Sequence, residues 1–258
     1  MLPEFDSVRC VGCMQCASAC PMGVIGKGEN GRPAVLPRRR CIGCMHCCSI
    51  CPRKAIRFEG LSEEQLYRSA PESPVEKLIV SRRSVRHFQP DPPPEALIRH
   101  ALDLAEYAPS GKNFHKTQWT VLYGKAAADH ICDFALEICR KTGEAPELPK
   151  LYAKGTNLLT CGAPCVIIGW SPDDCLNPVN DTIVAMTTLE LLLQSSGIST
   201  CWGGYLNQLS AHHASLRAEL GIPEGCNMRC ALMVGYPNRE SYRNIPYRPK
   251  ASIRWFSE

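Results

Sequence analysis

Residues 10–21 read CVGCMQCASACP, and residues 41–52 read CIGCMHCCSICP. Each stretch holds four cysteines with the spacing C-x-x-C-x-x-C-x-x-x-C, and a proline follows the fourth cysteine both times. The second stretch begins 31 residues after the first, so the pattern is an internal repeat. Nine of the 17 cysteines of this 258-residue chain lie between Cys10 and Cys51. This concentration predicts a small, separate unit at the head of the chain.

The spacing of the repeat indicates which metal the thiols bind. Cysteines at this density in a cytosolic chain indicate metal binding rather than disulfides. Structural zinc takes four ligands, normally from two C-x-x-C pairs, and has no use for a third thiolate at the same spacing. An iron–sulfur cubane takes three ligands from one tight loop and the fourth from elsewhere. The residues therefore favour iron–sulfur clusters and leave zinc as an alternative.

The repeat resembles the bacterial ferredoxin with two 4Fe-4S clusters, over about 50 residues and including both prolines. In that family the fourth cysteine of each run serves the other cluster. The resemblance implies one cluster held by Cys10, Cys13, Cys16 and Cys51. It implies a second cluster held by Cys41, Cys44, Cys47 and Cys20. Cys48, beside Cys47, stands outside this pattern and is either an alternative ligand or a small buried residue.

The charge of the chain is unevenly distributed. Residues 1–60 hold nine Lys and Arg against four Asp and Glu, whereas the remaining 198 residues hold 20 against 21. Cations near the cysteines either offset the negative charge of the clusters or form a solvated face; they are Arg38, Arg39, Arg40, Arg53, Lys54 and Arg57. A basic head also suits an acidic donor such as a ferredoxin or flavodoxin. Stacking aromatic residues are nearly absent, so we expect no nucleic acid partner.

Other classes of protein are disfavoured by what the sequence lacks. No apolar run approaches the roughly 18 residues that a membrane span needs. The start, MLPEFDSVRC, has neither a basic region nor an apolar region of a signal peptide, so we expect a cytoplasmic protein. No G-x-G-x-x-G or P-loop pattern follows an expected strand, which argues against a Rossmann unit and a nucleoside triphosphate site.

Helix-start patterns mark the end of the head. Ser62 with Gln65 forms a capping-box pattern, and Ser73 precedes Pro74 in a second one. We therefore expect a ferredoxin domain over residues 1–60, a linker helix region over 61–73 and a second domain over 74–258. In that domain, apolar periodicity predicts helices at 92–108, around 131–138 and at 181–196, and buried strands at 117–123, 165–170 and 229–235. The expected fold class is α+β, with helices against a sheet.

Four short segments of the second domain carry polar or glycine-rich sequence. They are RRS at 82–84, PSGKN at 109–113, TCWGG at 200–204 and YRPK at 247–250. In this order and spacing they resemble the FMN-dependent nitroreductase family over residues 74–258. The resemblance implies a nitroreductase-like FMN-binding α/β sandwich and a homodimer with FMN at each subunit interface. One branch of that family bears a fused N-terminal ferredoxin domain, as expected here.

The resemblance also implies roles for individual residues. Arg82, Arg83, Ser84 and Arg248 would surround the FMN phosphate, for which arginine offers bidentate geometry and a permanent charge. Arg86 would reach the pyrimidine side of the flavin, where a cation stabilises the reduced ring. Pro109, Ser110 and Asn113 would approach the ring from the partner subunit. Thr200, Cys201, Trp202 and Gly203 would line its other side.

Some roles stay open at this point. His115 stands where relatives commonly have Gln, and it is either a proton donor to the substrate or a histidine at the rim; no other catalytic residue suggests itself. Cys201 is either a reactive thiol beside the flavin or a packing residue. Cys161 with Cys165 lies beside an apolar strand, where core packing is the preferred interpretation.

The predicted function is that of a flavin and iron–sulfur oxidoreductase. Electrons from a low-potential donor or NAD(P)H would pass through two 4Fe-4S clusters and FMN to a small oxidised acceptor, such as a nitroaromatic or a quinone. A flavin accepts one or two electrons, which explains why both modules share one chain. The alternatives are a dedicated metabolite reductase or dehalogenase with the same cofactors, and a non-enzymatic redox carrier or sensor.

Overall fold

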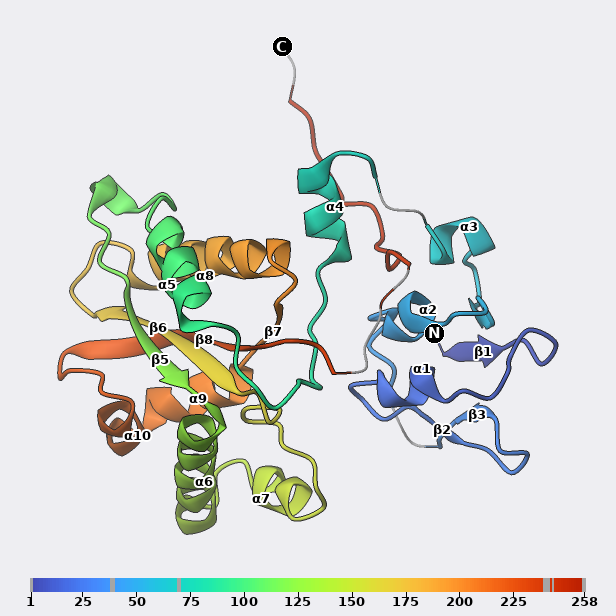
Figure 1. The fold of residues 1–258 in the computed structure, drawn as a ribbon, viewed down its shortest axis with the longest axis horizontal. Coiled ribbons are helices and arrows are strands. Elements are labelled where there is room, and N and C mark those ends of the chain that lie inside the picture. The colour runs from blue at the N-terminus through green and yellow to red at the C-terminus, as the bar shows by residue number, and fades with distance from the viewer. Residues whose placement is uncertain (1, 38–39, 69–70, 239–241, 243, 257–258) are drawn as a thin grey trace. The chain divides into compact units, whose positions relative to one another are not determined.

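The computed structural model describes residues 2–37, 40–68, 71–238, 242 and 244–256 (Figure 1). Arg38 and Arg39, named above among the cations of the head, lie outside the described residues. The chain forms two compact units. The first unit comprises Met1–Ser81 with Glu240–Glu258, and the second comprises Arg82–Arg239.

The first unit is built from short strands and short helices. Strand β1 (Pro3–Phe5) pairs antiparallel with β4 (Ile56–Phe58), and β2 (Ile25–Lys27) pairs antiparallel with β3 (Pro33–Val35). The helices are α1 (Gln15–Ser18), α2 (His46–Ile50), α3 (Glu63–Leu66) and α4 (Pro74–Ser81). Its small core includes Ile25, Ile56 and Phe58 from the strands together with buried cysteines of both runs. Cysteine sulfurs therefore form part of the packing of this unit.

The two cysteine runs adopt the same backbone turn. Gly12 and Gly43 precede the second cysteine of each run and have φ values of 69° and 62°. Met14 and Met45 stand before α1 and α2 in the left-handed conformation, with φ values of 58° and 60°. A non-glycine residue in this region costs on the order of 1 kcal/mol, which indicates that each loop is held by its surroundings. The repeat seen in the sequence is thus a repeat in structure.

The helix starts expected at the end of the head are confirmed. Ser62 and Gln65 form a reciprocal capping box at the start of α3. The Glu76 backbone N–H donates to Ser73 Oγ over 3.4 Å at the start of α4.

The described part of the C-terminal segment packs on the first unit. The Asn244 backbone N–H donates to the Ser49 carbonyl over 3.1 Å. Arg248 Nη1 donates to the Cys44 carbonyl over 3.3 Å. These bonds explain why residues beyond 239 group with the head, whereas the sequence assigned 74–258 to one domain. The functional boundaries of the domains stay a prediction.

The second unit contains a four-stranded antiparallel sheet in the order β5–β6–β8–β7. The strands are β5 (Gln118–Tyr123), β6 (Cys165–Pro172), β7 (Ser199–Trp202) and β8 (Cys226–Gly235). Three of them confirm the expected strands, and β7 is the addition that the sequence did not predict. With only four residues, β7 is too short to show a clear alternation of its own.

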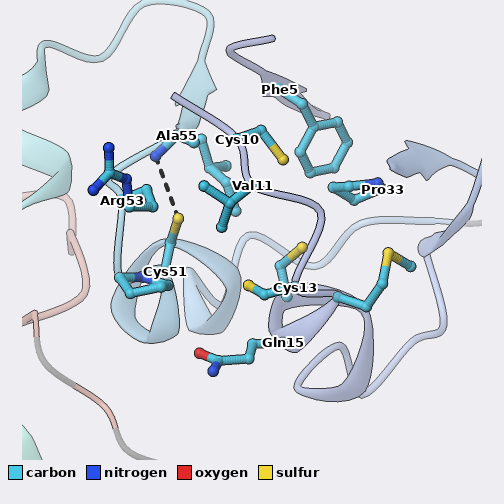
Figure 2. Close-up of a pocket in the computed structure, with 13 residues that line it drawn as sticks. Phe5, Cys10, Val11, Cys13, Gln15, Pro33, Cys51, Arg53 and Ala55 are labelled. Carbon is cyan, nitrogen blue, oxygen red and sulfur yellow. Dashed lines mark hydrogen bonds between the residues drawn. The ribbon is translucent and has the colours of Figure 1, made fainter. Parts of the chain in front are cut away.

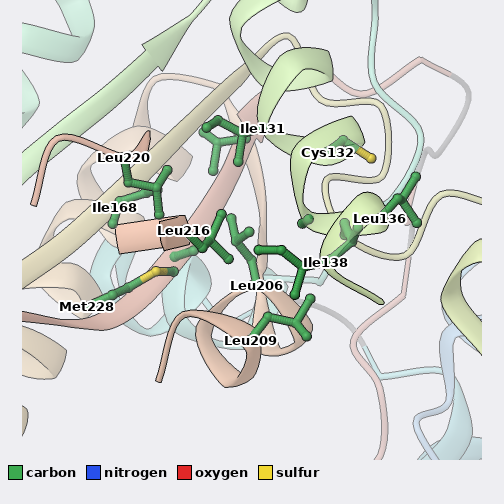
Figure 3. Close-up of a cluster of buried hydrophobic side chains, with 14 of the residues drawn as sticks. Ile131, Cys132, Leu136, Ile138, Ile168, Leu206, Leu209, Leu216, Leu220 and Met228 are labelled. Carbon is green, nitrogen blue, oxygen red and sulfur yellow. The ribbon is translucent and has the colours of Figure 1, made fainter. Parts of the chain in front are cut away.

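Helices cover both faces of this sheet (Figure 1). One face carries α5 (Glu95–Ala105) and α8 (Pro178–Ser195); the other carries α6 (Lys125–Thr142), α7 (Glu147–Tyr152), α9 (Gly204–His212) and α10 (Ala214–Glu219). Alternate residues of β6 face opposite cores. Val166 and Ile168 belong to the core formed with α6, α7, α9 and α10, which Figure 3 shows. Cys165 and Ile167 belong to the core formed with α5 and α8. The expected α+β sandwich is confirmed.

In the parts of the chain that the structure describes, no helix combines the length and the apolar character needed to cross a bilayer.

Candidate functional site

Two cavities in the first unit separate the cysteines into two sets of four. The first cavity is lined by Cys10, Cys13 and Cys16 of the first run and by Cys51 of the second (Figure 2). The other cavity is lined by Cys41, Cys44 and Cys47 of the second run and by Cys20 of the first run. Each cavity encloses about 350 Å³, including space open to solvent. Each set therefore combines three thiols of one run with the fourth thiol of the other.

Backbone amides point at several of these sulfurs. Val24 donates to Cys20 Sγ over 3.2 Å, Ala55 donates to Cys51 Sγ over 3.3 Å, and Gly43 donates to Cys41 Sγ over 3.4 Å. An N–H donor stabilises negative charge on the sulfur that accepts it, so these amides suit cysteine sulfurs bound to a metal. Two of the three acceptors are the fourth cysteines of their runs, which approach the opposite cavity.

Burial opposes ionisation of two other lining thiols, Cys16 and Cys44, when no cation is bound. It raises the pKa of Cys16 to about 12, with a further contribution from the neighbouring Cys47 and Cys51. Burial also raises the pKa of Cys44. A bound metal replaces the thiol proton and supplies the missing positive charge. The donor chemistry therefore fits a metal cluster enclosed by thiolates.

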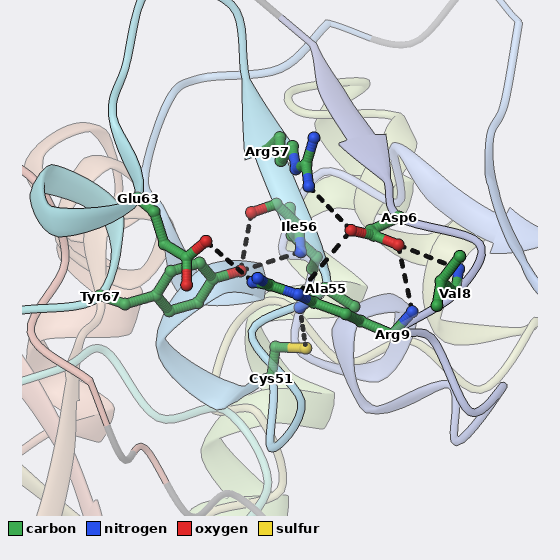
Figure 4. Close-up of polar contacts among 9 residues, drawn as sticks. All are labelled: Asp6, Val8, Arg9, Cys51, Ala55, Ile56, Arg57, Glu63 and Tyr67. Atoms are coloured by element: carbon green, nitrogen blue, oxygen red, sulfur yellow. Dashed lines mark hydrogen bonds and ion pairs between the residues drawn. The ribbon is translucent and has the colours of Figure 1, made fainter.

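Cys48 lines neither cavity and is fully buried in the small core of the head. This placement favours the packing interpretation over an alternative ligand. The cations also differ in their surroundings. Arg53 lines the first cavity, whereas Arg57 Nη2 pairs with Asp6 Oδ2 over 2.9 Å (Figure 4). The charge of Arg57 is therefore engaged with a carboxylate.

In the second unit, the Arg82–Arg86 segment runs beside β7. The Val85 backbone N–H donates to the Thr200 carbonyl over 2.9 Å, and Ser84 forms a parallel bridge with Thr200. This backbone pairing brings the Arg82–Arg86 segment next to TCWGG, although Ser84 and Thr200 are 116 residues apart in the sequence. Arg83 is buried, and its Nη1 donates to the Arg82 carbonyl over 2.7 Å.

A buried carboxylate joins three of the expected flavin residues. Glu190 of α8 is 3% exposed and accepts from Thr200 Oγ1 over 2.7 Å. It also accepts from Arg82 Nη1 over 3.3 Å and from Trp202 Nε1 over 3.0 Å. Buried charges persist only when they are paired and hydrogen-bonded, so this carboxylate fixes the side chains around it. The sequence signal for it was a single acidic residue in the otherwise apolar or neutral stretch from 182 to 196.

A larger cavity lies beside this network within the second unit. It encloses about 880 Å³, including space open to solvent. Its walls include Arg86, Cys201 and Trp202 of the expected flavin contacts, together with Leu158, Cys161, Gly204, Tyr205, Gln208 and Met233. Gly203 does not line it: a Cβ there would lie 3.0 Å from Ala231 Cβ, so this glycine permits close packing on β8.

The PSGKN segment is tied to α8 rather than to this cavity. The Gly111 backbone N–H donates to both carboxylate oxygens of Asp181, over 3.1 and 3.0 Å. The helix expected at 181–196 begins three residues earlier, since α8 starts at Pro178, and Asp181 lies in its first turn. Its carboxylate is therefore free to bind the loop.

His115 is placed by its neighbours in the same loop. Its backbone N–H donates to Ser110 Oγ over 3.0 Å, and its Nε2 lies 2.8 Å from Asn113 Oδ1. Neither Pro109, Ser110, Asn113 nor His115 lines the cavity described above. Arg248, expected at the phosphate, contacts Cys44 in the first unit. The roles of these residues toward FMN stay predictions.

The comparisons with known proteins agree with this division of the chain. The nitroreductase family model matches residues 79–236, and the 4Fe-4S dicluster domain model matches residues 9–56. Nitroreductase NfnB of Mycolicibacterium smegmatis is 26% identical over 213 residues, which cover 69% of this chain and 89% of that protein.

Solved structures share the fold. A nitroreductase with bound FMN from Bacteroides fragilis superposes with a TM-score of 0.62 at 21% identity, covering 72% of this chain and 100% of that one. A nitroreductase with bound FMN from Desulfitobacterium hafniense gives 0.58 at 24% identity, covering 70% and 97%. The family model spans more than half of the sequence, and so the chain belongs to the nitroreductase family, as an oxidoreductase of the nitroreductase type with an N-terminal 4Fe-4S dicluster domain.

Proposed function

We propose that this chain passes electrons from a low-potential donor or NAD(P)H through two 4Fe-4S clusters and FMN to a small oxidised acceptor, such as a nitroaromatic or a quinone. The main support for this proposal is the pair of cavities, each lined by three cysteines of one run and one cysteine of the other. Electron transfer between the 4Fe-4S domain and the nitroreductase domain would explain why the two are joined in one chain.

The eight lining cysteines would hold the clusters. Cys10, Cys13, Cys16 and Cys51 would bind one, and Cys41, Cys44, Cys47 and Cys20 the other. The amides of Val24, Gly43 and Ala55 would stabilise the anionic sulfurs, and such bonds tune cluster potentials. Arg53 at the first cavity would offset part of the cluster charge.

The Arg82–Arg86 segment and β7 would hold FMN. The relatives from B. fragilis and D. hafniense contain bound FMN, and the M. smegmatis NfnB structure is a complex with NADPH. Bound FMN exchanges one or two electrons, and therefore suits a chain that receives single electrons from clusters. Arg82, Arg83, Ser84 and Arg248 would serve the phosphate, and Arg86 the pyrimidine side.

The remaining residues would orient and shield the site. Glu190 would hold Arg82, Thr200 and Trp202 in one arrangement, which limits the reorganisation needed during electron transfer. Gly203 would keep β7 and β8 close. Ser110 would hold the backbone of His115 and Asn113 would orient its ring through Nε2, and His115 would be the candidate proton donor to the substrate.

A homodimer would complete the site. Phe114, Leu176 and Val179 are 52%, 53% and 50% exposed. Leu176 lies beside Gly111, where a Cβ would lie 3.1 Å from Leu176 Cδ2, and the Phe114 backbone N–H donates to the Gly111 carbonyl over 3.2 Å. Exposed apolar side chains at the start of α8 and beside the PSGKN segment suit burial against a second copy. Pro109, Ser110 and Asn113 would then reach the partner's flavin.

Elemental and flavin analysis of the anaerobically purified chain tests the cofactors. We expect about eight iron and eight acid-labile sulfide per chain, as for two cubane clusters, and one FMN. Cys47→Ser removes a lining thiol and is expected to lose about half of the iron. Cys48→Ser is the matched control, because Cys48 is adjacent and buried but lines neither cavity. Zinc without sulfide would contradict the assignment.

Stopped-flow reduction tests the path and the acceptor. With reduced ferredoxin as the donor, cluster absorption is expected to bleach before flavin absorption, and a nitroarene or quinone then reoxidises both. A chain that holds clusters but no flavin is a carrier or sensor. Slow turnover of every generic acceptor with rapid turnover of one metabolite identifies a dedicated reductase or dehalogenase.

A further inference from the structure

A tyrosine of the linker contacts the backbone that follows the last cysteine of the second run. Tyr67 comes directly after α3 and is 8% exposed. Its phenol oxygen accepts from the Ile56 backbone N–H over 2.8 Å and donates to the Ile56 carbonyl over 2.7 Å (Figure 4). Ile56 is buried, and it belongs to β4, which is an edge strand among the described residues. The phenol therefore satisfies a backbone donor and a backbone acceptor on the side of β4 that faces no strand.

The same contacts hold a peptide group that lies beside a cysteine sulfur. The Ala55 carbonyl accepts from the Asp6 backbone N–H over 2.9 Å, and the Ile56 N–H of the same peptide group donates to Tyr67. The N–H of Ala55 itself donates to Cys51 Sγ over 3.3 Å. The direction of this N–H group therefore depends on a peptide group that Tyr67 and Asp6 hold from opposite sides.

The turn between Cys51 and Ala55 needs support from outside. Lys54 has a φ value of 50°, in the left-handed region that a residue with a side chain rarely adopts. Its Nζ lies 5.9 Å from the centroid of the Tyr67 ring, at the distance of a cation–π contact. Tyr67 thus contacts the turn through its ring and the following strand through its hydroxyl group.

We propose that Tyr67 is a positioning residue for the first cluster, whose phenol keeps the Ala55 amide on Cys51 and thereby raises the reduction potential of that cluster. An N–H donor to a ligating sulfur stabilises the more negative, reduced form, so losing the donor lowers the potential. The proposal rests on the cluster ligation proposed above. It adds a residue outside both family matches, which cover residues 9–56 and 79–236.

A surface ion pair joins α3 to the other end of the same cysteine set. Arg9 Nη1 lies 2.8 Å from Glu63 Oε2, with the two side chains 42% and 51% exposed. Exposed pairs of this kind contribute little, because water and salt screen them. Arg9 directly precedes Cys10, so the linker contacts the chain next to the first cysteine of the set and, through Tyr67, next to the last. The buried phenol is expected to be the stronger of the two links.

The corresponding amide at the second cavity is supported in a different way. The Val24 N–H donates to Cys20 Sγ over 3.2 Å, and the Val24 carbonyl accepts from the Leu36 backbone N–H over 2.8 Å. Val24 directly precedes β2 and Leu36 directly follows β3, so backbone pairing of this hairpin holds the amide. The second cluster therefore serves as an internal reference for a change at Tyr67.

A redox titration followed by electron paramagnetic resonance tests the role of Tyr67 in the anaerobically purified full-length chain. Tyr67→Phe removes the hydroxyl group and keeps the ring. At the potential where half of the wild-type first cluster is reduced, we expect the ratio of reduced to oxidised first cluster to fall at least about threefold, as for the loss of one hydrogen bond. The second cluster is expected to titrate as in wild type. Cys47→Ser, which removes a thiol of the second cavity, assigns the two transitions.

Tyr247→Phe is the matched control, because Tyr247 packs against the same small core of the head, and both clusters are expected to keep their wild-type potentials. Iron and sulfide contents of the same samples separate the two levels of the argument. A wild-type chain without the expected iron contradicts the cluster assignment itself. Tyr67→Phe with full iron and unshifted potentials overturns the role of Tyr67 alone. If Tyr67→Phe retains less iron, a wild-type potential of the remaining first cluster shows a purely structural role and also overturns the proposal.

Discussion

Glu190 shows how one buried residue organises a site built from distant segments. Its two carboxylate oxygens accept from Arg82, Thr200 and Trp202, which come from either side of α8 in the sequence. A glutamine at this position keeps the shape but presents an N–H group toward one of these donors. Because donors then face donors, we expect Glu190→Gln to lose about 1.5–3 kcal/mol of FMN binding free energy or of unfolding free energy.

Flavin titration and thermal unfolding measure the effect of Glu190→Gln. Glu137→Gln is the control, because Glu137 is about half exposed and pairs with Arg140 and Lys141 on the surface. Unchanged flavin affinity and unchanged melting temperature in Glu190→Gln would remove the positioning role.

The titration of Cys201 gives a pH-dependent prediction. Its pKa in the folded chain, about 7, lies below the ordinary value of 9.0, and the leading cause is the hydrogen bond from Cys161. Alkylation requires the thiolate, so the rate is expected to be low at pH 5–6 and to rise through pH 7. Removing the donor in Cys161→Ala raises the pKa of Cys201 and moves the profile to higher pH. Iodoacetamide kinetics followed on the Cys201 peptide provide the measurement, and coincident profiles for the two proteins would contradict the assigned cause.

At the scale of elements, Asp181 links the first turn of α8 to the loop that carries Ser110, Asn113 and His115. Two charge-assisted contacts from one amide hold the loop at Gly111. Asp181→Asn leaves one acceptor in place of two, and we expect faster proteolysis within residues 110–116 with a loss of about 1–2 kcal/mol of stability. Limited trypsin digestion at Lys112 and Lys116 reports the loop directly. Asn180→Asp is a control at the neighbouring exposed position of the same helix.

The C-terminal segment gives a second prediction at this scale. Asn244 contacts the carbonyls of Ser49 and Cys48, and Arg248 contacts the carbonyl of Cys44, which lines the second cavity. Arg248→Ala is therefore expected to make the second cluster more sensitive to oxygen, measured as faster loss of iron in air. Loss of FMN with unchanged iron would instead support the phosphate role that the family resemblance implies.

Much of the architecture could be predicted from the sequence, because local patterns determine it. The cysteine repeat, the Ser62 capping box and the strands β5, β6 and β8 depend on residues close together in the chain. The contacts of Glu190 and Asp181 could not be predicted, since they join residues 10 to 108 positions apart in the sequence that meet only in three dimensions. Arg248 illustrates the same limit: a local motif named the residue, but tertiary packing decides what it touches.

At the scale of the whole molecule, the distribution of apolar surface leads to a prediction about assembly. Helix α8 is apolar on most sides, yet Val179 and Val184 are 50% and 39% exposed, and Leu176 and Phe114 are also about half exposed. A single subunit leaves these side chains in water, at roughly 25 cal/mol for each Å² of apolar surface. We therefore expect a homodimer whose flavin binding depends on association.

Sedimentation with simultaneous detection of flavin absorption tests this dependence. Val179→Lys places a charge on the surface that the dimer would bury, and we expect it to yield monomers that release FMN on dilution. Val75→Lys is the control, because Val75 is an exposed valine of the first unit, and we expect it to leave the dimer intact. The physical reason is that a like-charged pair across a two-fold interface cannot be buried without a partner. A Val179→Lys monomer that retains FMN at nanomolar concentration would show that one subunit is sufficient to form the site.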